Sequence, residues 1–253
     1  MTWRDGWPIP GRVGEAETQD SEDWTQGLAG VNSIRPVPAG SMLWQCPVPP
    51  VRGDFPAVFP QENEGFSARR GLSPAWLWNH APTAGAFSLS AREGWLRLFA
   101  VCRCEEGSPF FRTPNVLGRR FTAAPKVTVQ VRLDPAGLLP GQEAGLVHFN
   151  GGRAYTSLTV FRREDGSLML RQDDAGTAPL SGDSPLMLQS VVTEGVNRFF
   201  FREGPDGAWT PLGDARRLTP GGFRGDFAGL FTRTFGEPGG YADFADFRYD
   251  GRA

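Results

Sequence analysis

The sequence has a single lysine, Lys126, and no cluster of basic residues. Its 253 residues include 26 Lys and Arg against 28 Asp and Glu, which gives a formal net charge of −2. A nucleic-acid-binding protein needs a basic footprint that displaces counterions from the phosphates. Because the arginines are spread thinly along the chain, nucleic acid is not an expected partner.

Long apolar segments are absent as well. No apolar run approaches the ~18 residues that would indicate a membrane span. The first residues, MTWRDGWP, lack the continuous apolar region of a secretory signal. We therefore expect no membrane partner and a cytoplasmic location.

Cysteine and histidine are scarce. The three cysteines are Cys46, Cys102 and Cys104, and the two histidines are His80 and His148. Without a secretory signal, reduced thiols are the expected state. Cys102 and Cys104 are expected on one face of a strand, where two such side chains do not bridge easily. A zinc site needs three or four nitrogen or sulfur ligands at recognisable spacing, and this sequence does not supply them.

Turn-forming and aromatic residues are abundant. The chain has 33 Gly, 22 Pro, 19 Phe and 8 Trp, a composition that disfavours long helices and favours strands. Residues 126–133 alternate apolar and polar side chains, which predicts a half-buried antiparallel strand. Asp165-Gly166 predicts a type I′ hairpin. Further strands are expected at 95–101, 144–149, 154–162, 168–170, 186–193, 196–203, 228–234 and 242–249. The pattern is typical of an all-β sandwich or barrel.

The first part of the chain differs from the rest. Residues 1–65 are rich in Pro, Gly and acidic residues and show no strand or helix periodicity. We expect an irregular extended arm there, held at intervals by Trp3, Trp7, Trp24 and Trp44, followed by the β domain at 66–253. Prolines disfavour regular strand pairing in such a segment.

Catalytic motifs are hard to find. The sequence has no Gly-x-Ser-x-Gly elbow and no Gly-rich phosphate loop. It also lacks closely spaced acids of the Glu-x-Asp-x-x-Glu kind, which would suit glycoside hydrolysis. Asp243 and Asp246 are three residues apart, which predicts opposite faces of a strand. Either could help to hold a structural calcium ion, although ordinary polar residues at a strand end explain them better. No other cofactor is expected.

Eight segments stand out together: WLWNH at 76–80, FSL at 87–89, GWLRL at 94–98, NVL at 115–117, RF at 120–121, AGL at 144–146, GLF at 229–231 and GGYADF at 239–244. In this order they resemble the C-terminal domain of family 43 glycoside hydrolases, the β-xylosidase group. The resemblance spans roughly residues 66–251. It implies a two-sheet antiparallel β-sandwich of the jelly-roll, concanavalin A-like type.

The same resemblance implies a role. The opening MTWRDGWP is similar to the end of that family's catalytic propeller, which carries the catalytic carboxylates, so no catalytic residue transfers to this chain. In two-domain relatives one loop of the sandwich brings an aromatic side chain to the mouth of the active site. By position that loop is 149–153 here. Phe149 would close a sugar subsite, with Asn150, Arg153 and Tyr155 as polar contacts, or Phe149 would be a core aromatic at a strand end.

Three functions remain open. The first is a non-catalytic accessory domain that assists a separate or missing propeller in bacterial breakdown of xylo- or arabino-oligosaccharides. The second is an independent carbohydrate-binding module, with Trp44, Trp76, Trp78 and Trp209 as candidate aromatics, although Trp76 and Trp78 share a strand face typical of the core. The third is a glycosidase in its own right. A sandwich without its propeller would expose an apolar face, which residues 1–65 would cover or two copies would pair through as a homodimer.

Overall fold

The computed structural model describes residues 63–251, apart from 102, 106, 122, 123, 205 and 222–224, together with four short strands nearer the N-terminus. The chain divides into two compact units, Met1–Ala57 and Val58–Ala253. In the first unit β1 (Thr2–Arg4) pairs with β2 (Trp7–Ile9), and β3 (Gly11–Val13) pairs with β4 (Ile34–Pro36). The sequence predicted no strands here. The rest of the expected arm, with Trp24 and Trp44, lies outside the described residues.

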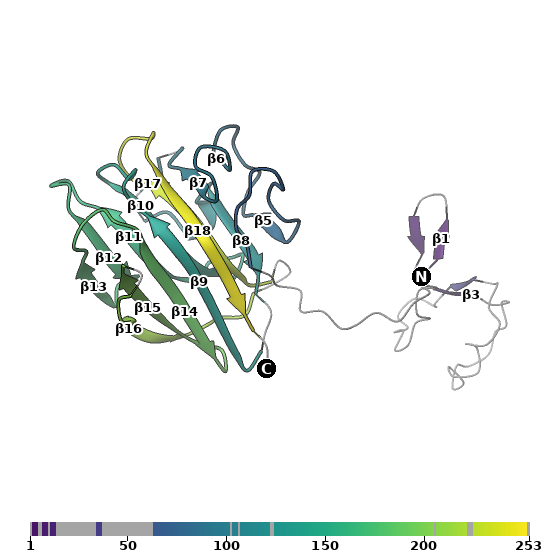
Figure 1. Ribbon diagram of the computed structural model, residues 1–253. Coiled ribbons are helices and arrows are strands. Elements are labelled where there is room, and N and C mark those ends of the chain that lie inside the picture. Colours follow the sequence, from purple (N-terminus) through teal and green to yellow (C-terminus); the bar gives the residue numbers. More distant parts are fainter. Residues whose placement is uncertain are drawn as a thin grey trace. The chain divides into compact units, whose positions relative to one another are not determined.

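The second unit consists of two seven-stranded antiparallel sheets, which form a β-sandwich (Figure 1). We name the sheets after their central strands. The β10 sheet has the order β13 (Gly176–Pro179), β12 (Leu168–Gln172), β11 (Tyr155–Arg162), β10 (Gln142–Phe149), β17 (Phe227–Thr234), β8 (Val116–Arg120), β5 (Trp76–Trp78). The β9 sheet has the order β16 (Thr210–Arg217), β15 (Val196–Glu203), β14 (Leu186–Thr193), β9 (Lys126–Asp134), β18 (Tyr241–Asp250), β7 (Leu96–Phe99), β6 (Phe87–Ser88).

The main core lies between the two sheets. On β9 the predicted apolar face is confirmed, because Val127, Val129, Val131 and Leu133 are all fully buried. Burying one such side chain contributes about 1.5–3 kcal/mol. The alternation therefore fixes which face of β9 meets the β10 sheet. Among the described residues no helix has the length and apolar character needed to cross a membrane.

Two hairpin turns show how turn chemistry sets the register. Arg162 pairs with Leu168 across the Asp165-Gly166 hairpin, so the hairpin is confirmed. The predicted turn type, I′, is wrong, because only Gly166 has a positive φ (84°), as in a type I turn followed by a bulge. The β14–β15 hairpin instead has positive φ at both Glu194 (49°) and Gly195 (75°), which is the type I′ pattern.

A second, smaller apolar cluster lies on the outer face of the β10 sheet. Residues 107–115 lie over this face, and the Cys104 amide donates to the Thr234 carbonyl at 2.7 Å. The 3₁₀ turn η2 (Phe110–Arg112) inserts Phe110, which is 1% exposed. Cys104 thus lies in a loop after β7 rather than in the predicted strand, and Cys46 and Cys102 are outside the described residues. The cluster comprises Phe110, Val116, Val147, Phe149, Phe227 and Phe231.

Candidate functional site

The β10–β11 connection carries the four predicted sugar-contact residues: Phe149 ends β10, Asn150 and Arg153 lie in the loop, and Tyr155 begins β11. Phe149 is only 3% exposed, and its ring meets Phe110 edge-on with centroids 5.6 Å apart. Tyr155 is 41% exposed and stacks on the other side of the aromatic cluster, with its ring 4.6 Å from that of Phe110. The accessible aromatic surface of this loop therefore belongs to Tyr155, while Phe149 supports it from the cluster below.

The two remaining predicted residues differ in their surroundings. The Asn150 side-chain oxygen accepts hydrogen bonds from the backbone amides of Gly152 (2.9 Å) and Ala154 (3.2 Å). This arrangement is an Asx-type turn that fixes the loop. Arg153 is exposed. Asn150 thus holds the loop in shape, and Arg153 extends from it into solvent.

A cavity of about 320 Å³ opens beside this loop, at one end of the sandwich. We call it the end cavity. Phe149, Asn150 and Tyr155 line it, and Arg153 does not. The end of β12, the end of β16 and the residue before β17 complete the wall with Asp173, Asp174, Arg216 and Asp226. Sequence reasoning missed these residues because only the pairing of distant strands brings them together.

His148 also lines the end cavity, from the buried side. Its Nε2 lies 2.6 Å from Ser190 Oγ, and the Ser190 hydroxyl donates to Asn197 Oδ1 at 2.6 Å. Since that hydroxyl proton is used for Asn197, Ser190 accepts a hydrogen bond from Nε2–H. Nδ1 is then a bare acceptor, and it has no hydrogen-bond partner among the described residues. Burial lowers the pKa of His148 from 6.5 to about 4, so the ring is neutral at pH 7.

Acid should destabilise the fold through His148. The unfolded chain takes up this proton near pH 6.5 and the folded chain near pH 4, so stability falls as the pH drops through that interval. A shift of this size corresponds to about 3 kcal/mol. Denaturant unfolding between pH 7 and pH 4 should show a steeper loss for wild type than for His148→Gln. Equal slopes would contradict the prediction.

The carboxylates of the end cavity have different environments. Asp173 accepts hydrogen bonds from the Thr156 hydroxyl (2.6 Å) and from the amide (2.9 Å) and hydroxyl (3.0 Å) of Ser157. Asp174 is exposed and pairs with Arg216 at 2.9 Å. Burial raises the pKa of Asp226, an effect that a backbone hydrogen bond from Gly221 opposes. Burial therefore shifts Asp226 toward its protonated form.

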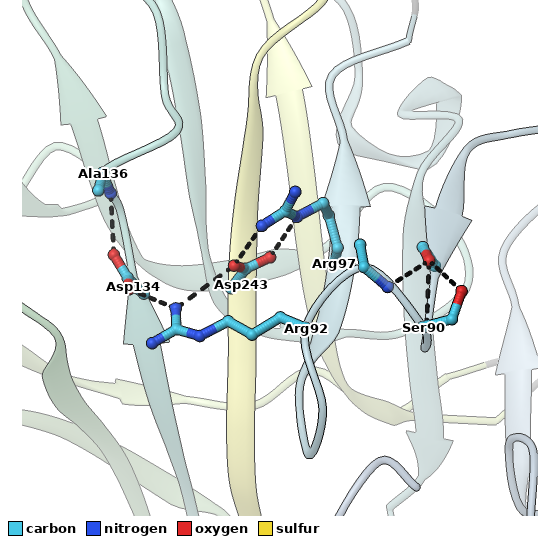
Figure 2. Close-up of polar contacts among 8 residues, drawn as sticks. Ser90, Arg92, Arg97, Asp134, Ala136 and Asp243 are labelled. Atoms are coloured by element: carbon cyan, nitrogen blue, oxygen red, sulfur yellow. Dashed lines mark hydrogen bonds and ion pairs between the residues drawn. The ribbon is translucent and has the colours of Figure 1, made fainter. Parts of the chain in front are cut away.

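Asp243 and Asp246, the alternative calcium ligands, are both held by arginines. Figure 2 shows Asp243 receiving two hydrogen bonds from Arg97, at 2.8 Å each, and a longer contact from Arg92 at 3.4 Å. Arg92 also bonds Asp134 at 2.6 Å, so two carboxylates share one guanidinium. These interactions engage both carboxylate oxygens of Asp243, which is 2% exposed.

The prediction that the two aspartates face opposite sides is wrong. A register shift between Ala245 and Arg248 and a positive φ (50°) at Asp246 mark a bulge in β18. The buried positions move from Ala242 and Phe244 to Phe247 and Tyr249. Both aspartates then face away from the core, where Asp246 pairs with Arg132 at 2.5 Å. No group of three or more His, Cys, Asp or Glu residues in the described part of the chain could hold a metal ion.

Calcium should therefore have little effect on this part of the fold. Arginine pairs already neutralise both aspartates, and Ca²⁺ takes 6–8 oxygen ligands. We expect millimolar CaCl₂ to leave the melting temperature unchanged relative to EDTA. A calcium-dependent rise in melting temperature that Asp243→Asn abolishes would contradict this.

The tryptophans considered for sugar binding are mostly used in packing. Trp76 is 6% exposed and belongs to the main core, and Trp78 packs against that core, as their shared strand face predicted. The Arg202 guanidinium lies 4.9 Å from the ring of Trp209. Trp44 lies outside the described residues.

The two antiparallel sheets, the inter-sheet core and the end cavity define a β-sandwich domain of the concanavalin A-like class. Residues 63–250 match the family model described as the beta-xylosidase C-terminal concanavalin A-like domain. The chain belongs to this family, as its sequence motifs predicted.

Relatives of known sequence or structure agree with this assignment. A β-xylosidase of Formosa agariphila is 28% identical over 99% of this chain, which spans 41% of that protein. A bifunctional family 43 glycoside hydrolase from Bacteroides eggerthii has a TM-score of 0.62 and 27% identity, covering 76% of this chain and 27% of its own. A xylan β-1,4-xylosidase from Bacillus halodurans C-125 shares the fold, with a TM-score of 0.63, 21% identity and coverage of 79% and 41%. The chain thus spans less than half of each of these relatives.

Proposed function

We propose that this chain is the accessory β-sandwich of a family 43 glycoside hydrolase and assists a catalytic propeller in cleaving xylan-type oligosaccharides. The family match over residues 63–250 carries the proposal. The similarity to a β-xylosidase, of which this chain spans 41%, supports xylo- or arabino-oligosaccharides as the substrate class. The propeller would be a separate chain or another part of the same protein.

The state of the buried carboxylates supports a non-catalytic role. Glycoside hydrolysis needs one acid to protonate the leaving group and a second carboxylate across the scissile bond. In the sandwich domain the carboxylate of the buried Glu143 lies between Arg171 and Arg233, and the carboxylate of Asp243 is bound by Arg97. Both carboxylates are thus occupied by guanidinium groups and are not available to a sugar.

The loop after β10 supports a positioning role near the sugar. Tyr155 offers an exposed ring, Asn150 fixes the turn, and Arg153 reaches outward beside them. Aromatic rings with a polar tip suit a boundary that is apolar on one side and wet on the other. We propose that Tyr155 and Arg153 contact the oligosaccharide while Phe149 supports them from below.

Reconstitution with a propeller tests the proposal. The chain should be mixed with a family 43 propeller domain that lacks its own sandwich, and hydrolysis of xylobiose measured as kcat/KM. We expect the chain to raise kcat/KM at least about tenfold, which is about 1.4 kcal/mol of transition-state stabilisation. Arg153→Ala should reduce the gain, while Asp183→Asn, an exposed substitution on another loop, should not. The absence of both a complex and a rate change would contradict the proposal.

A glycosidase activity of the chain itself is the second candidate. It is favoured by Asp226, whose pKa burial raises and which shares the end cavity with two other aspartates. A screen with nitrophenyl xylosides and arabinosides separates the two functions. Release of nitrophenol by the chain alone, lost in Asp226→Asn, would establish this candidate and remove the accessory role.

A further inference from the structure

Unpartnered polar atoms converge on the end cavity. His148 Nδ1, Arg216 Nε and Asp226 Oδ1 are buried, lack a hydrogen-bond partner among the described residues, and belong to residues that line this one cavity. Leaving a buried polar group without a partner costs about 1–3 kcal/mol. Proteins rarely leave such groups unpaired, so ordered water or a ligand with matching polar groups supplies their partners, and three of them around one cavity form a ready-made polar site.

The three atoms define what that ligand must offer. His148 Nδ1 is a bare acceptor because Nε2 carries the proton that reaches Ser190. Asp226 Oδ1 is a second acceptor, and Arg216 Nε–H is a donor. Two acceptors and one donor match hydroxyl groups, each of which can donate and accept. A polyhydroxylated molecule satisfies all three atoms at once.

The charge and the size of the end cavity further restrict the class of ligand. Three aspartates, Asp173, Asp174 and Asp226, line the cavity together with Arg216 and Arg217, so an anion would meet more negative than positive charge. The volume of about 320 Å³ is at the lower end of the ~300–1,000 Å³ typical of ligand pockets. Tyr155 also lines the cavity, and its ring stacks on Phe110 in the outer cluster. The ligand that fits is small, neutral and hydroxylated.

We infer that the end cavity is a binding site for a single neutral sugar unit. Its hydroxyls donate to His148 Nδ1 and Asp226 Oδ1 and accept from Arg216 Nε, and Tyr155 borders the sugar at the cavity wall. That the sugar is an aldopentose such as xylose or arabinose rests on the proposed function, whereas the site itself does not require a propeller.

Nuclear magnetic resonance on the full chain tests the site directly. His148 and His80 are the only histidines, so one imidazole signal reports on the cavity and the other serves as a control outside it. His80 lies outside the cavity, with Nε2 2.6 Å from the Phe111 carbonyl oxygen. Titration with xylose, arabinose and xylobiose at pH 7 should shift the His148 signal saturably and leave His80 unchanged. No shift of His148 at about 100 mM of any of these sugars, well above the millimolar dissociation constants that weak sites show, would overturn the inference.

Two variants distinguish a built site from a surface effect. Asp226→Asn and Tyr155→Ala should each weaken binding by about 2- to 10-fold, the change expected for one hydrogen bond or one small contact. Asp183→Asn and Leu139→Ala are controls of the same type, since Asp183 pairs with Arg162 and Leu139 is 44% exposed. Equal affinity in all four variants would overturn the inference, as would a His148 shift produced by CaCl₂ and not by sugar.

The accessory function and the sugar site in the end cavity can be contradicted independently of each other. A chain that raises propeller activity but shows no His148 shift with sugar would keep the accessory function and remove the cavity site. A chain that binds xylose through Asp226 and Tyr155 but leaves every propeller unchanged would keep the site and remove the accessory function.

Discussion

Replacing Asp243 with asparagine is expected to lower the free energy of unfolding by about 3 kcal/mol. The carboxylate is 2% exposed and accepts both hydrogen bonds of a bidentate Arg97 pair, with Arg92 as a further partner. Hydrogen bonding to Asp243 raises the pKa of Arg97, and without that partner the guanidinium still stays charged, because an arginine side chain is not deprotonated in proteins. A half-buried guanidinium without a counter-charge is the main cost, because Asn keeps the shape of Asp but not its charge.

Asp246→Asn is the matched control for this prediction. It removes an ion pair from the same strand, but the side chains of Asp246 and Arg132 are 49% and 43% exposed. Exposed pairs contribute about 0–1 kcal/mol. Urea unfolding of the two variants should therefore differ by at least about 2 kcal/mol. Similar losses in both would show that solvent screens Asp243 as fully as Asp246.

Phe110→Ala is expected to cost about 3–5 kcal/mol. Phe110 is 1% exposed, lies in a three-residue 3₁₀ turn and contacts the rings of Phe149, Tyr155 and Phe231. Within residues 107–115 this turn is the only regular element, so the vacated space closes only if these residues shift. The loss of the stacked ring should also free Tyr155, and with it the rim of the end cavity.

Phe111→Ala provides the comparison, because Phe111 is adjacent but only partly buried against the same cluster. We expect it to cost less than half as much in guanidinium unfolding. Tyr155 nuclear magnetic resonance linewidths should change in Phe110→Ala and not in Phe111→Ala. If both variants lose the same stability, the outer cluster is not organised around Phe110.

The strands could be predicted from sequence wherever one local rule dominates. Residues 126–133 alternate without a break, and β9 buries the predicted face. The ranges 186–193 and 196–203 agree with β14 and β15 because Glu194-Gly195 supplies the two positive φ angles of a tight hairpin. Local periodicity and turn chemistry act within a few residues, so they can be predicted from the sequence alone.

Features that depend on distant partners could not be predicted. The bulge at Asp246 places one more residue in β18 than β9 can pair with, and no local sequence pattern indicates it. The end cavity joins residues 148–150 and 154–156 with Arg216 and Asp226, which are neighbours only after the two sheets pack. The loop after β10 could be named in advance, but not that Tyr155 rather than Phe149 would present its accessible ring.

The outermost strands carry a consequence for association in crowded solution. On one side of the sandwich the sheets end in strands of three residues (β5) and two residues (β6), too short to template an added chain. On the other side β13 ends at Pro179, and β16 contains Pro211, which has no amide proton to donate. Such borders resist amyloid-like strand addition. Any pairing of two copies would then involve side chains on the faces of the sheets and would not add strands to either sheet.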